Sequence, residues 1–206
     1  MSRKSHDKTQ VHELLYQALE TEMGGIKIYE TAITCAANKD LREEWSEYLA
    51  ETKGHRKTLL RVFEQLGLDP DADSPGRKVV AHIGNSLVEA MKLARKAGNA
   101  AAAQLVAAEC VTQAETKDHL NWELIGHIAE NTTGKLAAVL KTAHEEVEGQ
   151  EDHHLYHTKG WCRELWIDAL GFPAVLPPPE EIMNVGTAIG AARAENRREK
   201  MLGAEA

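Results

Sequence analysis

Glutamates and histidines occur in pairs, three or four positions apart, at several places in this sequence. The pairs are Glu51 with His55, Glu115 with His119, and Glu151 with His154. Residues three or four positions apart share one face of a helix, so each pair can present a carboxylate and an imidazole to the same neighbour. These two groups together are suited to divalent iron or manganese. The spacing therefore indicates metal binding, provided that helices bring the pairs together.

The sequence around these pairs predicts long helices. Sustained alternation of β-branched residues is absent, and Gly and Pro fall between long stretches of helical periodicity. We expect helices over about Lys8–Ala37, Asp40–Leu66, Lys78–Lys96, Ala100–Glu130 and Lys135–Leu170. This order gives a short-turn hairpin, a long crossover that carries its own helix, and a second short-turn hairpin. The predicted fold is thus all-α, a four-helix bundle with the single long crossover of the ferritin-like topology.

Each of the four main helices carries a glutamate on the apolar stripe that should face the core. These glutamates are Glu22, Glu51, Glu115 and Glu151. Counted from the turn of each hairpin, the facing glutamates lie within roughly one helical turn of each other, at about 1.5 Å per residue. Burying an unpaired carboxylate costs several kcal/mol, so such a group of acids needs a compensating charge. A pair of divalent metal ions would supply it.

The full set of candidate metal ligands is Glu22, Glu51, His55, Glu115, His119, Glu151 and His154. Other interpretations of its members stay open. Glu22 taken alone could face solvent, and each glutamate–histidine pair could make a plain interhelical hydrogen bond. His119 could support Glu115 instead of binding metal, and His157, which flanks the stripe, is a further open candidate.

An internal repeat relates the first main helix to the third. Glu22 is followed seven residues later by Tyr29, and Glu115 is followed seven residues later by Trp122. Another glutamate comes directly after each aromatic residue. A duplicated hairpin would produce this pattern. We expect both aromatic side chains in the core, where a tyrosine could also hydrogen-bond a metal ligand.

Residues 8–165 resemble the ferritin-like superfamily, which includes bacterioferritins, rubrerythrins and the YciF-like stress proteins. The segment Glu22-Met-Gly-Gly-Ile-Lys-Ile-Tyr29 is similar to the first-helix motif of bacterioferritins, and Glu151-Asp-His-His154 to the fourth-helix Glu-x-x-His. The resemblance implies Glu22 and Glu115 as single ligands, and the pairs Glu51/His55 and Glu151/His154 as the others. The chain departs from the family pattern in two ways: its second helix has the spacing Glu-x-x-x-His, and it lacks a CxxC pair.

The resemblance implies about two iron ions per chain, with manganese as the alternative because the same ligands accept both. The first functional hypothesis is an oxidoreductase that reacts with dioxygen or peroxide and receives electrons from an unidentified donor. The second is iron binding or storage without an organic substrate. The third is a stress-related or scaffold protein in which the site is structural or empty.

The composition limits which partners and which cellular compartment we expect for this protein. The formal net charge is −8 without a basic cluster, which argues against nucleic-acid binding. No apolar run approaches the roughly 18 residues of a membrane span. The polar segment 1–7 shows no secretory signal, and three widely spaced cysteines fit a reducing cytoplasm. A helix face beyond the site could support a homodimer.

We divide the chain into a bundle, residues 1–170, and a C-terminal extension, residues 171–206. The extension begins with Gly171-Phe-Pro173 and continues through a stiff spacer at Pro177-Pro178-Pro179. Its remainder, Glu180–Ala206, is Ala-rich and charged, and we expect a short helix or partial disorder there.

Overall fold

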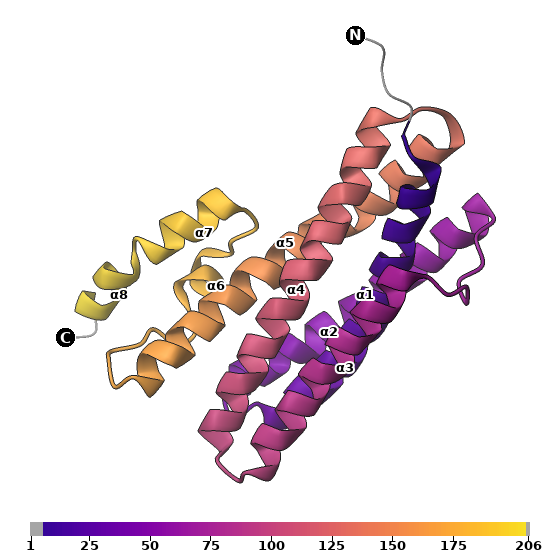
Figure 1. Cartoon of the computed structure of the whole chain (residues 1–206). Coiled ribbons are helices and arrows are strands. Elements are labelled where there is room, and N and C mark those ends of the chain that lie inside the picture. The colour runs from indigo at the N-terminus through magenta and orange to yellow at the C-terminus, as the bar shows by residue number, and fades with distance from the viewer. Residues whose placement is uncertain (1–5, 205–206) are drawn as a thin grey trace.

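A computed structural model describes residues 6–204 of the chain, and this described part is helical throughout, without a strand (Figure 1). Its helices are α1 (Lys8–Cys35), α2 (Lys39–Leu66), α3 (Pro75–Lys96), α4 (Ala100–Asn131), α5 (Gly134–Ala169), α6 (Pro179–Met183), α7 (Ala188–Glu195) and α8 (Arg198–Ala204). The predicted all-α class is confirmed. The polar N-terminal segment and the end of the tail fall partly on residues 1–5 and 205–206, outside the described residues.

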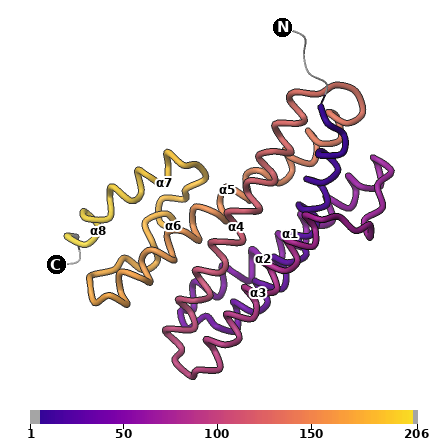
Figure 2. Tube along the Cα trace, viewed as in Figure 1, coloured from indigo at the N-terminus to yellow at the C-terminus, as the bar shows by residue number. Residues whose placement is uncertain are grey.

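Helices α1, α2, α4 and α5 make the bundle, and α3 lies along its outer side against α1 and α4 (Figures 1 and 2). The α1–α2 and α4–α5 connections are short, whereas α3 lies on the crossover between them. Packing is closest between α4 and α5 and sparser between α2 and α5. None of the helices in the described part has the length and apolarity that a membrane span requires.

Two helix ends differ from the sequence prediction by more than one residue, each for a local reason. Helix α3 begins at Pro75, three residues before the expected start, because Ser74 caps it and accepts a hydrogen bond from Arg77 N. Helix α1 ends at Cys35 because Ala36 adopts an extended conformation. Beyond that point the side chain of Gln104 accepts a hydrogen bond from Ala37 N, which turns the chain toward α2.

The apolar core has two parts with a polar layer between them. One part gathers around Tyr29, Trp45 and Trp161, and the other around Leu15 and Trp122. Every bundle helix contributes to both parts, so each helix crosses from one apolar cluster to the other near its middle. The acids and imidazoles of the predicted site occupy this crossing level.

The described part of the C-terminal extension is helical, in three short pieces, and α6 is anchored to α5. Arg163 Nη1 lies 2.7 Å from Glu180 Oε1, and the fully buried Glu164 accepts hydrogen bonds from Arg198 Nε and from the backbone of the extension. Gly160 lies so near α6 that a Cβ there would stand 2.5 Å from Glu180 Oε2. Charge pairing and a close helix contact together hold the extension on the bundle.

Candidate metal centre

The polar layer brings together six of the seven predicted residues. Five of them are almost completely buried: Glu22, His55, Glu115, Glu151 and His154. The sixth, Glu51, retains 25% exposure of its side chain and lies at the edge of the group. The seventh, His119, is not part of it, because its Nε2 lies 2.8 Å from Asp152 Oδ1 on the outer side of α4 and α5.

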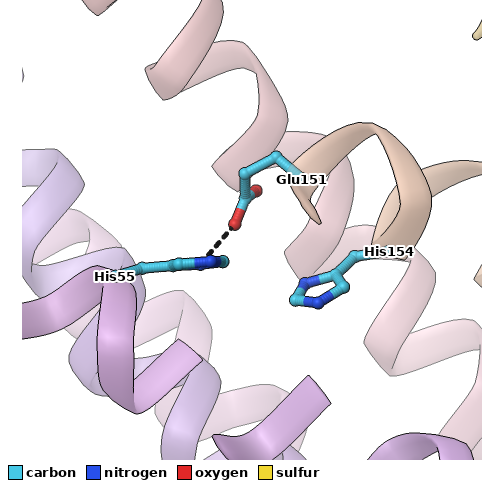
Figure 3. A group of neighbouring side chains, drawn as sticks. All are labelled: His55, Glu151 and His154. Carbon is cyan, nitrogen blue, oxygen red and sulfur yellow. Dashed lines mark ion pairs between the residues drawn. The ribbon is translucent and has the colours of Figure 1, made fainter. Parts of the chain in front are cut away.

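His55 joins α2 to the facing helices. Its Nδ1 lies 2.8 Å from Glu151 Oε1 and 3.8 Å from Glu22 Oε1 (Figure 3). Its Nε2 lies 2.7 Å from Gln150 Oε1, an oxygen that only accepts hydrogen bonds. The proton of the neutral ring therefore sits on Nε2, and Nδ1 presents a lone pair to the carboxylates.

His154 plays the corresponding part on α5. Its Nε2 lies 2.7 Å from Glu51 Oε2 and its Nδ1 lies 3.6 Å from Glu115 Oε2. The ring centres of His55 and His154 are 5.6 Å apart. Figure 3 shows both imidazoles directed into the space that Glu151 also enters. Each imidazole thus lies between carboxylates from two other helices.

Two aromatic side chains each donate a hydrogen bond to one oxygen of a buried glutamate. Trp122 Nε1 donates to Glu22 Oε1 at 2.8 Å, and Tyr29 donates through its hydroxyl to Glu115 Oε1 at 2.7 Å. The second oxygen of each carboxylate, Oε2, has no hydrogen-bond partner in the structure. These bonds restrain both carboxylates and leave one oxygen of each without a hydrogen-bond partner.

Asp118 is a further member of the site that the sequence prediction missed. It is buried on α4, and its Oδ1 has no hydrogen-bond partner. One oxygen each from Asp118, Glu22 and Glu151 lie within 4.8 Å of one another. The signal was its position three residues after Glu115, the spacing that also relates Glu151 to His154.

The buried acids hold their protons strongly. Burial raises the pKa of Glu22 well above its ordinary value, and the charges of Asp118 and Glu151 add to the effect. Burial likewise raises the pKa of Asp118, with Glu151 and Glu115 adding to it, and it raises the pKa of Glu151 to about 8. Like charges at one buried level therefore oppose the ionised state that metal binding requires.

The other ligand candidates respond to the same negative charge. Burial alone would lower the pKa of His154, but the close carboxylate of Glu115, the hydrogen bond to Glu51 and the charge of Glu151 raise it to about 10. Burial would raise the pKa of Glu51, yet the hydrogen bond and charge of His154 lower it. Burial lowers the pKa of His55. Without a bound cation, the imidazole of His154 acts as the counter-charge of the layer.

The residues of the layer fit a metal site because several of their possible ligand atoms make no hydrogen bond. Several buried ligand atoms lack any hydrogen-bond partner, namely Glu22 Oε2, His55 Nδ1, Glu115 Oε2, Asp118 Oδ1, Glu151 Oε2 and His154 Nδ1. Buried polar atoms without partners are rare in folded proteins, and each calls for a physical explanation. Two overlapping groups have ligand atoms within 4.8 Å of one another: His55, Glu151 and His154, and Glu22, Asp118 and Glu151. The shared residue, Glu151, lies at their centre.

Two hollows lead from the surface to this layer. One, of about 520 Å³, runs along the sparse α2–α5 contact and is lined by Glu51, His55 and Gln150. The other, of about 440 Å³, opens between α4 and α5 and reaches Glu151, with His119 in its wall. Small molecules can therefore approach the centre from two sides.

Comparison of the chain with protein-family models, with curated proteins and with solved structures found no significant match. A fold by itself does not fix a function, since one architecture serves many chemistries. Function must therefore be inferred from the residues of this site and their geometry.

Proposed function

We propose that the polar layer binds two metal ions, iron in the first place, within a ferritin-like bundle. The unpartnered ligand atoms carry this proposal, because they come from all four bundle helices and converge at one level. Carboxylates and imidazoles projecting inward from four helices form the sites of di-iron and di-manganese carboxylate proteins. Manganese is the alternative occupant, since these ligands discriminate poorly between the two metals.

The contacts divide the ligands into two sets related by the bundle. His55 with Glu22 forms one set, and His154 with Glu115 forms the other. Glu151 on α5 contacts His55 on α2, while Glu51 on α2 contacts His154 on α5. Each of these two carboxylates thus reaches from its own helix to the imidazole of the other, and both would help to hold the two ions. Asp118 adds a carboxylate beside Glu22 and Glu151.

The reaction that we propose for this centre is the reduction of dioxygen or peroxide, with electrons that come from a separate donor. A reduced pair of iron ions can supply two electrons to such an oxidant. The chain's part is to hold the ligands and to control access. Tyr29 and Trp122 orient Glu115 and Glu22 by donating hydrogen bonds to them. The hollow beside Glu51 would admit a small oxidant.

A purely structural role is the competing proposal, and specific contacts favour it. His55 and His154 lie 2.8 Å and 2.7 Å from carboxylate oxygens of Glu151 and Glu51, so the acids and imidazoles partly compensate one another without metal. In that case the layer would combine an ion pair between His154 and Glu51 with a neutral contact between His55 and Glu151. Such pairs can be retained for specificity of packing without adding net stability.

Metal content per chain separates these two roles. After anaerobic Fe(II) loading, we expect the wild-type chain to hold about two iron ions more than a Glu51→Ala/Glu151→Ala double variant. His119→Ala is the matched control, because it removes a nearby imidazole that is directed away from the layer. Retention of both ions in the double variant, or no metal in the wild type, would refute the two-metal proposal. Oxygen and peroxide consumption by the loaded protein then tests the reaction.

A further inference from the structure

A second cluster of possible ligands lies where α5 meets the C-terminal extension. His153 and His157 stand one helical turn apart on α5, and Glu181 belongs to α6. Ligand atoms of the three residues lie within 4.8 Å of one another. The two imidazole rings have centres 3.5 Å apart and are tilted by 34°. Histidines four positions apart on a helix are a recurrent arrangement for holding one metal ion.

The surroundings of His157 fix which nitrogen is available. The residue is 1% exposed, and its Nε2 lies 2.8 Å from the carbonyl oxygen of Val185. A carbonyl only accepts hydrogen bonds, so Nε2 carries the proton. Nδ1 lies 2.7 Å from Glu181 Oε1, but neither atom has a hydrogen-bond partner. Metal-binding histidines commonly donate their second nitrogen to a carbonyl in this way.

A second, half-buried carboxyl group, that of Glu44, interacts with this cluster. Glu44 on α2 accepts hydrogen bonds from Tyr48 at 2.6 Å and from Trp161 at 2.7 Å. Burial raises the pKa of Glu44 to about 8, and the charge of Glu181 contributes to this rise. A bound cation would compensate the charge of both carboxylates.

We propose that His153, His157 and Glu181 bind a single divalent first-row transition-metal ion, separate from the central layer. Two imidazoles and one carboxylate are a donor set that zinc and iron accept, with a further position left for water. The ion would join α5 to α6 and so hold the extension on the bundle. This proposal does not depend on the two-metal centre, because its three ligands are distinct from those of the layer.

Zn(II) binding to the full-length chain tests the site. We expect Glu181→Gln and His153→Gln each to bind about one ion fewer than the wild type in equilibrium dialysis. Glu151→Gln, which alters the central layer, should retain the ion that Glu181→Gln loses. If the central layer takes no metal, the wild type should still bind about one ion and Glu181→Gln none. Equal binding by the wild type, Glu181→Gln and His153→Gln would overturn the proposal and leave only a direct contact between His157 and Glu181.

Limited proteolysis gives a second readout that does not depend on stoichiometry. Zn(II) should slow cleavage within residues 171–204 of the wild type and of Glu151→Gln. It should not slow cleavage of His153→Gln, in which the altered residue belongs to α5 and lies outside the cleaved segment. Circular dichroism of each variant shows whether the helices are retained. Equal protection of His153→Gln would contradict a ligand role for this residue.

Discussion

The hydroxyl of Tyr29 on α1 donates a 2.7 Å hydrogen bond to Glu115 Oε1 on α4, 86 positions further along the chain. The reverse relation holds between the same two helices, because Trp122 on α4 donates to Glu22 on α1. Each donor follows the glutamate of its own helix by seven residues. The repeated spacing in the sequence thus has a structural meaning: each helix supplies one acid and the support for the acid of the other.

Replacing Tyr29 with phenylalanine tests this support. The change leaves Glu115 Oε1 buried without its donor, and we expect metal affinity to fall by roughly 10- to 100-fold, as for other hydrogen bonds that orient metal ligands. Isothermal titration with Fe(II) under anaerobic conditions measures the affinity. Tyr16→Phe is the control, since Tyr16 packs edge-on against Phe63 away from the layer. Equal affinities of the two variants would show that the Tyr29 bond does not position a ligand.

Asp118→Asn should separate stability from metal binding. Burial and the neighbouring acids raise the pKa of Asp118 and so favour its protonated form in the metal-free protein, which asparagine resembles. We expect the free energy of unfolding of the metal-free variant to lie within about 1 kcal/mol of that of the wild type. We also expect it to bind iron more weakly. Thermal unfolding with and without Fe(II) checks both, and a variant that loses stability but keeps its metal would place Asp118 outside the ligand set.

The pH dependence of the metal-free protein follows from the raised pKa values. Glu151 keeps its proton up to about pH 8 in the folded chain, whereas an unfolded chain releases it near the ordinary value of 4.5. His154 keeps its proton to about pH 10 against an ordinary 6.5. The folded state therefore binds more protons in both windows, and the free energy of unfolding should fall as pH rises through them.

Denaturant unfolding at a series of pH values measures this slope. Bound metal should reverse it, because deprotonated ligands bind metal better and the stabilisation by metal grows with pH. Glu151→Gln serves as the control, since it removes one titrating group and should reduce the slope between pH 4.5 and about 8. A metal-free wild type that gains stability throughout this range would contradict the assignment of neutral buried acids.

Gly160→Ala should loosen the C-terminal extension while leaving the bundle folded. The added Cβ would stand 2.5 Å from Glu180 Oε2, so the carboxylate that pairs with Arg163 and anchors α6 must shift. Overpacking of this kind typically costs about 1–3 kcal/mol. We expect faster proteolysis within residues 171–204 and little change in helical circular dichroism. Gly149→Ala is the matched control on the same helix, because its Cβ would have no neighbour within 4 Å.

Local periodicity predicted much of this arrangement. The helix bounds and the inward positions of Glu22, Glu115 and Glu151 follow from the 3.6-residue repeat and from Gly and Pro at the helix ends. His119 illustrates the limit of this reasoning. On α4 the buried face runs through Glu115, Asp118 and Trp122, and His119 lies one step around the helix, toward Asp152. The choice between spacings of three and four depends on how the helix is rotated, which tertiary packing decides.

The extension could not be predicted in the same way. Its anchoring depends on Glu164, Glu180 and Arg198, which are far apart in the sequence and show no periodic pattern. Charged residues in an Ala-rich tail usually indicate a solvated surface. Only the long-range pairing reveals that Glu164 and Glu180 are buried.

The polar layer also sets where the bundle opens. Because it separates two apolar clusters, the middle of each long helix has fewer apolar contacts than the segments on either side. Helices usually fray from their ends, but opening free energy follows local burial. In the metal-free chain we therefore expect the middle of the bundle to be a second place of weak amide protection, where amide exchange would report on cation occupancy.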